Sequence, residues 1–158
     1  MFRPRVYVDT SVIGGCEDQE FSSISRAFFE QVRRGRYLLL VSELTYYELQ
    51  KAAEAVRRHF DTLTEDCVAE VPIDAEVEAL AQAYIDAGAL PASRRADATH
   101  VAAATVARAD FLLSWNFRHI VNINRIHKFK GINIQHGYPA VEIYSPLELS
   151  HDEQEENV

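Results

Sequence analysis

Residues 37–41 (YLLLV) form the apolar run that most narrows the folds open to this chain. A strand that is apolar at every position is typical of a sheet covered on both faces. Helical patterns separate most of the further short strands expected, at residues 5–8, 68–73, 111–114 and 141–144. Strands that alternate with helices need crossover connections, which favour parallel pairing. The sequence therefore predicts an α/β fold with three layers, α/β/α, around a mostly parallel sheet of four to five strands.

The helix boundaries are predicted from capping residues. Serine and aspartate side chains accept N–H bonds where helices start, and glycine commonly follows their ends. Helices are therefore expected to begin after Ser22 or Ser23, Ser42, Asp74 and Ser93, and two of them to stop at Gly35 and Gly88. In the helix expected after Ser93, one face is apolar at helical spacing, which predicts that this face lies in the core. Its residues are Ala98, Val101, Ala102, Thr105, Val106 and Ala109.

Composition places the chain among globular proteins. Hydrophobic residues make up 47% and charged residues 25% of 158 residues, which suits one domain over residues 1–150. No apolar run approaches the roughly 20 residues that cross a bilayer, and the first residues lack the apolar region of a signal peptide. Cys16 and Cys67 form neither a disulfide framework nor a metal-ligand spacing. We therefore expect a cytoplasmic protein with no membrane partner.

Charge is distributed unevenly along the chain. The net charge of −8 argues against a broad electrostatic surface for nucleic acid. The tail, residues 151–158, is acidic and is expected to be disordered. Residues 111–141 contain no Asp or Glu, but they include Arg118, Arg125, Lys128 and Lys130. This region is either a solvated helix and loop or a local phosphate-binding surface.

Polar residues recur where the predicted strands end. Asp9 ends the first strand, Glu48 lies in the helix after the second, and Asn116 follows the strand at 111–114. Asp97 lies in the first turn of the helix that leads into that strand. Because ligand sites of open parallel sheets lie beyond the carboxyl ends of the strands, these four side chains can converge on one edge.

Each acid also has an ordinary structural interpretation. Asp9 could accept backbone N–H bonds in a turn at the strand end. Asp97 could complement the helix macrodipole, and Glu48 could face solvent, where glutamate is almost always found. His100, three residues after Asp97, could be a general base or a metal ligand, but a buried, hydrogen-bonded histidine is the better interpretation.

The motifs VYVDTS, LLLVSELTYYEL, RADATHVAAA and DFLLSWNF follow one another along residues 6–117. As a set and in this order, they resemble those of PIN-domain nucleases, including the VapC-type toxins of toxin–antitoxin pairs. The resemblance spans essentially residues 5–149 and implies a PIN-like domain. It implies that Asp9, Glu48 and Asp97 are metal ligands, and that Thr10 or Ser11 supports the site.

The chain departs from the family pattern at one position. The fourth acidic position of the family falls on Asn116, which is an amide. Mg²⁺ and Mn²⁺, the ions that the resemblance implies, prefer hard oxygen ligands with compensating negative charge. The carbonyl oxygen of Asn116 could still orient a metal-bound water, so we expect a second metal site to be weakened more than the first.

The resemblance implies a metal-dependent endoribonuclease that hydrolyses RNA phosphodiester bonds and leaves a 5′-phosphate. Single-stranded or looped RNA is the expected substrate. Candidate phosphate contacts are Arg118, Lys128 and Lys130, and Trp115 or Phe117 could stack a base, although Trp115 equally suits the core. The resemblance implies two partners. One is a small antitoxin protein, and the other is a second copy of this chain, docked through residues 60–84. The alternative function is a catalytically weakened PIN-like module that binds RNA or protein without cleaving it.

Overall fold

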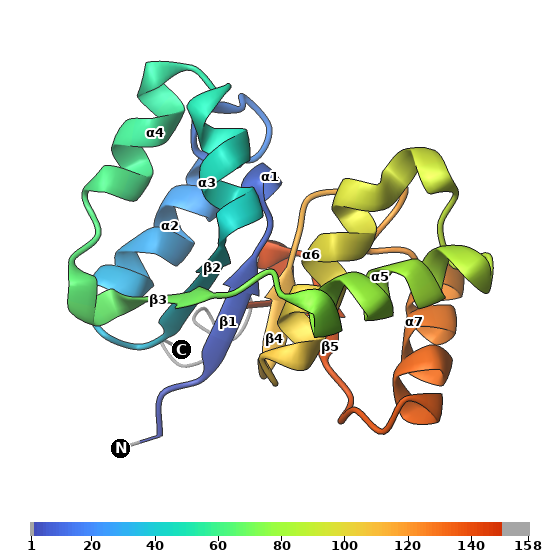
Figure 1. The fold of residues 1–158 in the computed structure, drawn as a ribbon. Coiled ribbons are helices and arrows are strands. Elements are labelled where there is room, and N and C mark those ends of the chain that lie inside the picture. The colour runs from blue at the N-terminus through green and yellow to red at the C-terminus, as the bar shows by residue number, and fades with distance from the viewer. Residues whose placement is uncertain (1, 150–158) are drawn as a thin grey trace.

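The computed structural model of the protein describes residues 2–149 (Figure 1). The acidic tail at 151–158, expected to be disordered, lies outside the described residues. Strands in the described part form one parallel sheet with the order β3-β2-β1-β4-β5. They are Arg5–Val8 (β1), Leu38–Ser42 (β2), Val68–Val71 (β3), Phe111–Leu113 (β4) and Glu142–Tyr144 (β5). The predicted α/β class and parallel sheet are confirmed.

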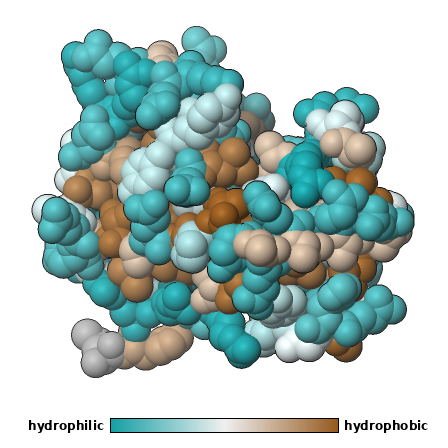
Figure 2. All heavy atoms as spheres, viewed as in Figure 1, coloured by the Kyte–Doolittle hydropathy of each residue, from teal (hydrophilic) through white to brown (hydrophobic). Residues whose placement is uncertain are grey.

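Helices cover both faces of this sheet (Figure 1). Helices α1 to α4 lie on one side of the sheet and α5 to α7 on the other (Figure 1). Their bounds are Thr10–Gly14 (α1), Ser22–Arg33 (α2), Glu43–Gln50 (α3), Glu54–Asp61 (α4), Ala75–Asp86 (α5), Arg95–Val106 (α6) and Ile123–Gln135 (α7). In the same view, the surface over α4 is mostly hydrophilic (Figure 2), and no residue of α4 is fully buried. None of the helices in residues 2–149 combines the length and the apolar composition needed to cross a membrane.

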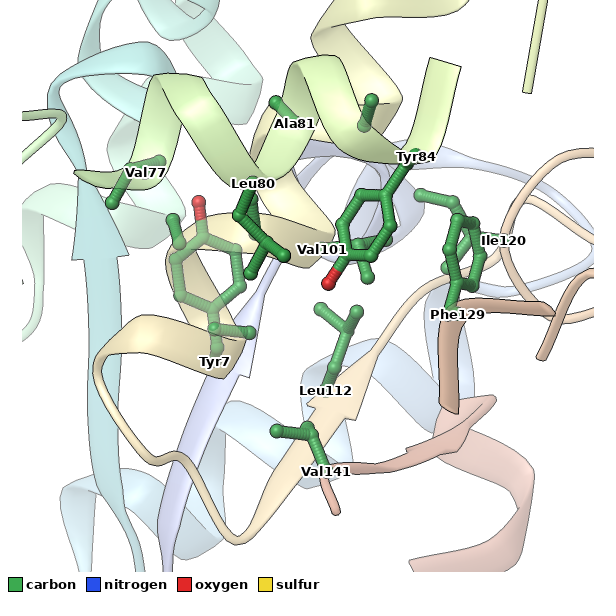
Figure 3. Close-up of a cluster of buried hydrophobic side chains, with 14 of the residues drawn as sticks. Tyr7, Val77, Leu80, Ala81, Tyr84, Val101, Leu112, Ile120, Phe129 and Val141 are labelled. Atoms are coloured by element: carbon green, nitrogen blue, oxygen red, sulfur yellow. The ribbon is translucent and has the colours of Figure 1, made fainter. Parts of the chain in front are cut away.

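The central strand β1 divides the core into two clusters because its side chains alternate between the faces. Tyr7 points to the face covered by α5, α6 and α7, where it belongs to one core cluster with Leu80, Tyr84 and Leu112 (Figure 3). Val6 and Val8 point to the opposite face and pack with α1 and α2 residues. The apolar side of α5, within the region suggested for docking a second copy, lies in this chain's own core.

Several helix starts differ from the sequence-based expectation. Ser42 and Asp74 cap α3 and α5 as predicted, and Gly35 and Gly88 take the positive φ that favours glycine. Helix α2 instead has Phe21 at its N-cap, and α6 begins at Arg95 after a short 3₁₀ turn, Ala92–Arg94, that contains Ser93. The turn expected after Asp9 is instead the helix α1.

The carboxyl ends of the strands lie at one edge, together with α1, the start of α3 and the start of α6 (Figure 1). Gly15, which follows α1, allows a close approach at this edge. A Cβ atom at Gly15 would lie 2.5 Å from Ser25 Oγ and 2.7 Å from Trp115 Nε1. The missing side chain therefore lets the segment after β1 pack directly on the segment after β4.

Candidate active site

Asp9 is buried at the carboxyl end of the central strand, with 4% of its surface exposed. Ser11 Oγ donates to its Oδ1 at 2.5 Å, and Ser114 Oγ donates to its Oδ2 at 2.7 Å. Its side chain makes no capping bond to the following helix, which excludes the turn interpretation. Burial raises the pKa of Asp9, and the negative charge of Asp97 adds to this effect.

The two serines are themselves held by the backbone after β4. Trp115 N donates to Ser11 Oγ at 2.9 Å, and Asn116 N donates to Ser114 Oγ at 2.9 Å. Trp115 is buried, stacks on Phe21 at 4.0 Å and belongs to the core, so it is not exposed for base stacking. The carboxylate of Asp9 is thus fixed from both of its oxygens by a rigid frame.

Glu48 lies at the same edge, 34% exposed, on the last turns of α3. Its Oε1 accepts a hydrogen bond from Thr10 Oγ1 at 3.0 Å and lies 2.5 Å from His100 Nε2. Glu48 is therefore not the free solvent-facing residue of the ordinary interpretation. The geometry also connects Thr10, rather than Ser11, to this second acid.

A buried hydrogen-bonded chain continues from Glu48 into the core. His100 Nδ1 lies 2.7 Å from the Tyr7 hydroxyl, which lies 2.8 Å from Ser42 Oγ. Burial by itself lowers the pKa of His100, but Tyr7, Glu48 and Asp9 raise it to about 10. For Glu48, burial by itself raises the pKa, but the contacts with His100 and Thr10 bring the pKa below its usual value. His100 is thus a buried, bonded histidine whose positive charge faces the acids.

Asp97 lies in the first turn of α6, with 18% of its side chain exposed. Burial raises its pKa, and the negative charge of Glu48 adds to this effect. His119 Nδ1 lies 4.0 Å from its Oδ2. Asp9, Glu48 and Asp97 therefore share one electrostatic environment around His100, although they come from segments far apart in the sequence.

Asn116 caps the turn that follows β4. Its Oδ1 accepts the backbone N–H of Arg118 at 3.2 Å and that of His119 at 2.9 Å. This arrangement gives the amide oxygen two protein partners and directs His119 toward Asp97. The role expected for Asn116, the orientation of a metal-bound water, stays a prediction.

The described residues 2–149 contain no group of three His, Cys, Asp or Glu side chains already close enough to hold a metal ion. The chemistry of the donors nevertheless fits a hard divalent cation. Asp9 and Asp97 are carboxylates whose charged form is disfavoured by burial, and a cation would compensate both charges. Glu48, drawn to His100, would reach the ion by a side-chain movement or through a water molecule.

Four further residues shape the site. Ser114 ends the strand predicted at 111–114 and directly follows β4, so the strand-end rule that selects Asp9 could have selected it too. His119 carries no signal of its own in the sequence, because its approach to Asp97 depends on the turn at Asn116. Tyr7 and Ser42 occupy core-facing positions, and only the assembled sheet reveals their contact with each other.

The candidate phosphate contacts fall into two groups. Arg118 and Lys128 line the same surface cavity, together with Arg125. Lys130 instead pairs with Glu142 of β5, its Nζ 3.4 Å from Oε2. Phe117, the other candidate for base stacking, is 46% exposed beside this turn.

Comparisons with known proteins extend these observations. Neither a scan against protein-family models nor a search of curated proteins gave a match. Among solved structures, the fold is similar to a chain in the crystal structure of VapBC2 from Rickettsia felis bound to a DNA fragment from their promoter. The TM-score is 0.56 at 12% identity, and the match covers 89% of this chain and 98% of that chain. The protein therefore has a VapC-like PIN fold.

Proposed function

We propose that the protein is a divalent-metal-dependent endoribonuclease that hydrolyses RNA phosphodiester bonds. The observation that carries this proposal is the pair of carboxylates at the carboxyl edge of the sheet, Asp9, which is buried, and Asp97, which is partly buried, with Glu48 beside them. Burying carboxylates near one another is unfavourable unless a cation compensates them. Perturbed acids of this kind favour a functional site, and the VapC-like fold supports the nuclease class.

In this proposal Asp9 and Asp97 hold Mg²⁺ or Mn²⁺, and Glu48 acts directly or through water. When bound, such an ion lowers the pKa of water and neutralises charge on phosphate oxygens. Ser11 and Ser114 orient Asp9 while leaving acceptor sites on both of its oxygens. Thr10 and His100 keep Glu48 ionised and aimed into the site.

The proposed substrate is single-stranded or looped RNA, because its backbone can bend into a recessed acidic site. Cleavage would leave a 5′-phosphate. Arg118, which follows β4 next to His119, and Lys128, which lines the same cavity, are proposed to contact phosphates. Lys130 would contribute to a phosphate only by giving up its pairing with Glu142.

We also propose a toxin role with a small antitoxin partner, because the structural neighbour is a VapBC2 complex. Cys16 and Cys67, both free and buried, suit action in the cytoplasm. Expression is expected to slow growth, and co-expression of the partner to relieve it. Normal growth under strong expression of an RNA-cleaving protein would argue for a housekeeping nuclease. Homodimerisation is proposed from the resemblance to PIN-domain proteins, and sedimentation of the purified protein tests it.

The decisive experiment measures cleavage of labelled RNA by the purified protein with Mn²⁺ or Mg²⁺ and with EDTA. Asp9→Asn and Asp97→Asn are expected to abolish metal-dependent cleavage. Asp61→Asn, which removes the same charge from an exposed position on α4, is the matched control and is expected to cleave normally. Cleavage that survives in Asp9→Asn would overturn the assignment of the site.

A second candidate function is an RNA-binding or protein-binding module without cleavage. It is favoured by Asn116, which supplies an uncharged side chain where the family has an acid and whose oxygen already accepts two N–H groups. RNA binding without cleavage, in protein that demonstrably binds Mn²⁺, would select this function.

A further inference from the structure

A cavity of about 790 Å³ lies between the α5–α6 connection and the first turns of α7. Its size is within the range of small-molecule sites. The lining residues from the turn after β4 and the start of α7 are Arg118, Asn122, Asn124, Arg125 and Lys128, and those from α5 and the α5–α6 connection are Ile85, Gly88, Leu90, Pro91 and Ala92. The cavity therefore has one cationic, polar side and one mainly apolar side.

The cationic wall has no acidic counterpart. Three of the lining residues are Arg or Lys, and none is Asp or Glu. No acid occurs anywhere in residues 111–141, in a chain whose net charge is −8. The local positive charge favours an anionic ligand at the cavity, whereas the net negative charge of the rest of the chain disfavours it elsewhere.

Part of this wall is fixed before any ligand binds. Arg125 Nη1 donates to the carbonyl of Ala89 at 2.7 Å, and its Nε donates to the carbonyl of Arg118 at 3.1 Å. The guanidinium thus joins the α5–α6 connection to the turn after β4. Because the two walls are held together in this way, little ordering is needed when a ligand enters. Arg118 and Lys128 are exposed and can close on a phosphate.

The cavity begins next to the candidate active site. Arg118 is the neighbour of His119, whose Nδ1 lies 4.0 Å from Asp97 Oδ2. Asn116 holds both residues in one turn through their backbone N–H groups. Arg118 of the cavity and His119 beside Asp97 are therefore adjacent residues of the same turn.

We propose that this cavity binds one nucleotide of the single-stranded RNA substrate, adjacent to the scissile phosphate. Its phosphate contacts Arg118 and Lys128, and its base and ribose lie against Pro91 and Ile85. A cavity with a cationic side and an apolar side matches the two ends of a nucleotide, whereas a bare phosphate would leave the apolar side without a contact. This inference rests on the proposed ribonuclease function, because it names the substrate unit held beside the same site.

The test measures binding of a fluorescein-labelled ten-nucleotide uridine RNA by anisotropy, with the full chain in EDTA so that no cleavage occurs. Arg118→Gln and Lys128→Gln are each expected to weaken binding about tenfold. Each is also expected to lower the slope of log K against log salt concentration by roughly 0.7, the value for one phosphate contact on a single strand. Circular dichroism confirms that each variant is folded.

Two control variants sharpen the comparison. Arg34→Gln removes an exposed charge just after α2, at the opposite edge of the sheet, and is expected to leave RNA binding unchanged. Lys130→Gln removes the same charge from α7 but outside the cavity, where Lys130 pairs with Glu142. A loss with Lys130→Gln as large as that with Lys128→Gln would overturn the assignment to the cavity.

A competitor separates the two macromolecules that an anionic site could take. Unlabelled uridine RNA is expected to displace the probe, and a glutamate peptide of equal charge is expected not to. Displacement by the peptide would assign the cavity to an acidic protein partner and overturn the proposal. The proposed function and the nucleotide subsite can fail independently. RNA binding through Arg118 and Lys128 without metal-dependent cleavage would contradict the nuclease function. Cleavage that is unchanged in Arg118→Gln and Lys128→Gln would contradict the nucleotide subsite.

Discussion

His119 Nδ1 lies 4.0 Å from Asp97 Oδ2, and Asn116 holds the backbone of His119 in that place. Burial and the nearby Arg94 lower the pKa of His119, which favours a neutral imidazole at pH 7. A neutral imidazole beside a carboxylate does not compete with a cation for its charge. The side-chain amide of Asn116 thus positions His119 beside Asp97 and does not itself contact the acid.

This relationship predicts different effects for two substitutions of Asn116. Aspartate caps a turn as well as asparagine does, so Asn116→Asp should preserve the turn and add negative charge near the metal, and Mn²⁺ affinity should rise. Asn116→Ala loses the cap and releases His119, so Mn²⁺ affinity should fall about 10–100-fold, as when an outer-shell partner is removed. Isothermal titration with Mn²⁺ measures both. Equal affinities for the two variants would contradict this account of Asn116.

The charge of Asp97 is predicted to cost stability when no metal is present. Its pKa is raised by burial, so its ionised form is disfavoured in the folded protein. In EDTA, Asp97→Asn should therefore raise the melting temperature, by about 2–4 °C for each kcal/mol gained. Adding Mn²⁺ should stabilise the unmodified protein and have little effect on the variant. A melting temperature lowered by Asp97→Asn in EDTA would show that the carboxylate has a structural partner.

The interaction of His100 with Glu48 predicts how stability depends on pH. The pKa of His100 is raised from 6.5 to about 10 in the folded protein. Its contribution is therefore fully present below pH 6.5 and is lost as the pH rises toward 10, because the unfolded chain loses this proton first. Thermal unfolding in EDTA between pH 6.5 and 10 should show this decline, and His100→Gln should flatten it. A profile for His100→Gln parallel to that of the unmodified protein would assign the decline to other groups.

Gly15→Ala is predicted to destabilise the edge of the sheet that carries Asp9. The added Cβ would lie 2.5 Å from Ser25 Oγ and 2.7 Å from Trp115 Nε1, so the indole must move. Overpacking of this kind costs about 1–3 kcal/mol. Urea unfolding measures the loss. Gly14→Ala is the matched control, because a Cβ at Gly14 meets nothing within 4 Å.

Much of the fold could be predicted from the sequence because its signals are local. The apolar run of β2 and the caps Ser42 and Asp74 each specify their own element. The short helix α1 could not be predicted, because Ile13-Gly14-Gly15 has the composition of a turn. It is helical because Val12 and Ile13 are buried against the face of the sheet, a tertiary effect.

The candidate site could be predicted only as a set of acids at strand ends. Asp9, Glu48 and Asp97 lie at one edge, as the order of strands and helices requires. The hydrogen bonds that these acids make could not be predicted, because Ser114 reaches Asp9 across 105 positions and His100 reaches Glu48 across 52. Likewise, the separation of Lys128 from Lys130 depends on the rotation of α7 against β5.

The central place of β1 has a consequence for synthesis. Its partners β2 and β4 come from opposite halves of the chain, and Asp9 bonds to Ser114 only when β4 has docked. A nascent chain that has emerged as far as α5 carries Asp9 and Glu48 but neither Asp97 nor Ser114. Such a chain would lack the complete set of acids while it is still attached to the ribosome and its RNA. Topology thus delays assembly of the site until most of the domain has been made.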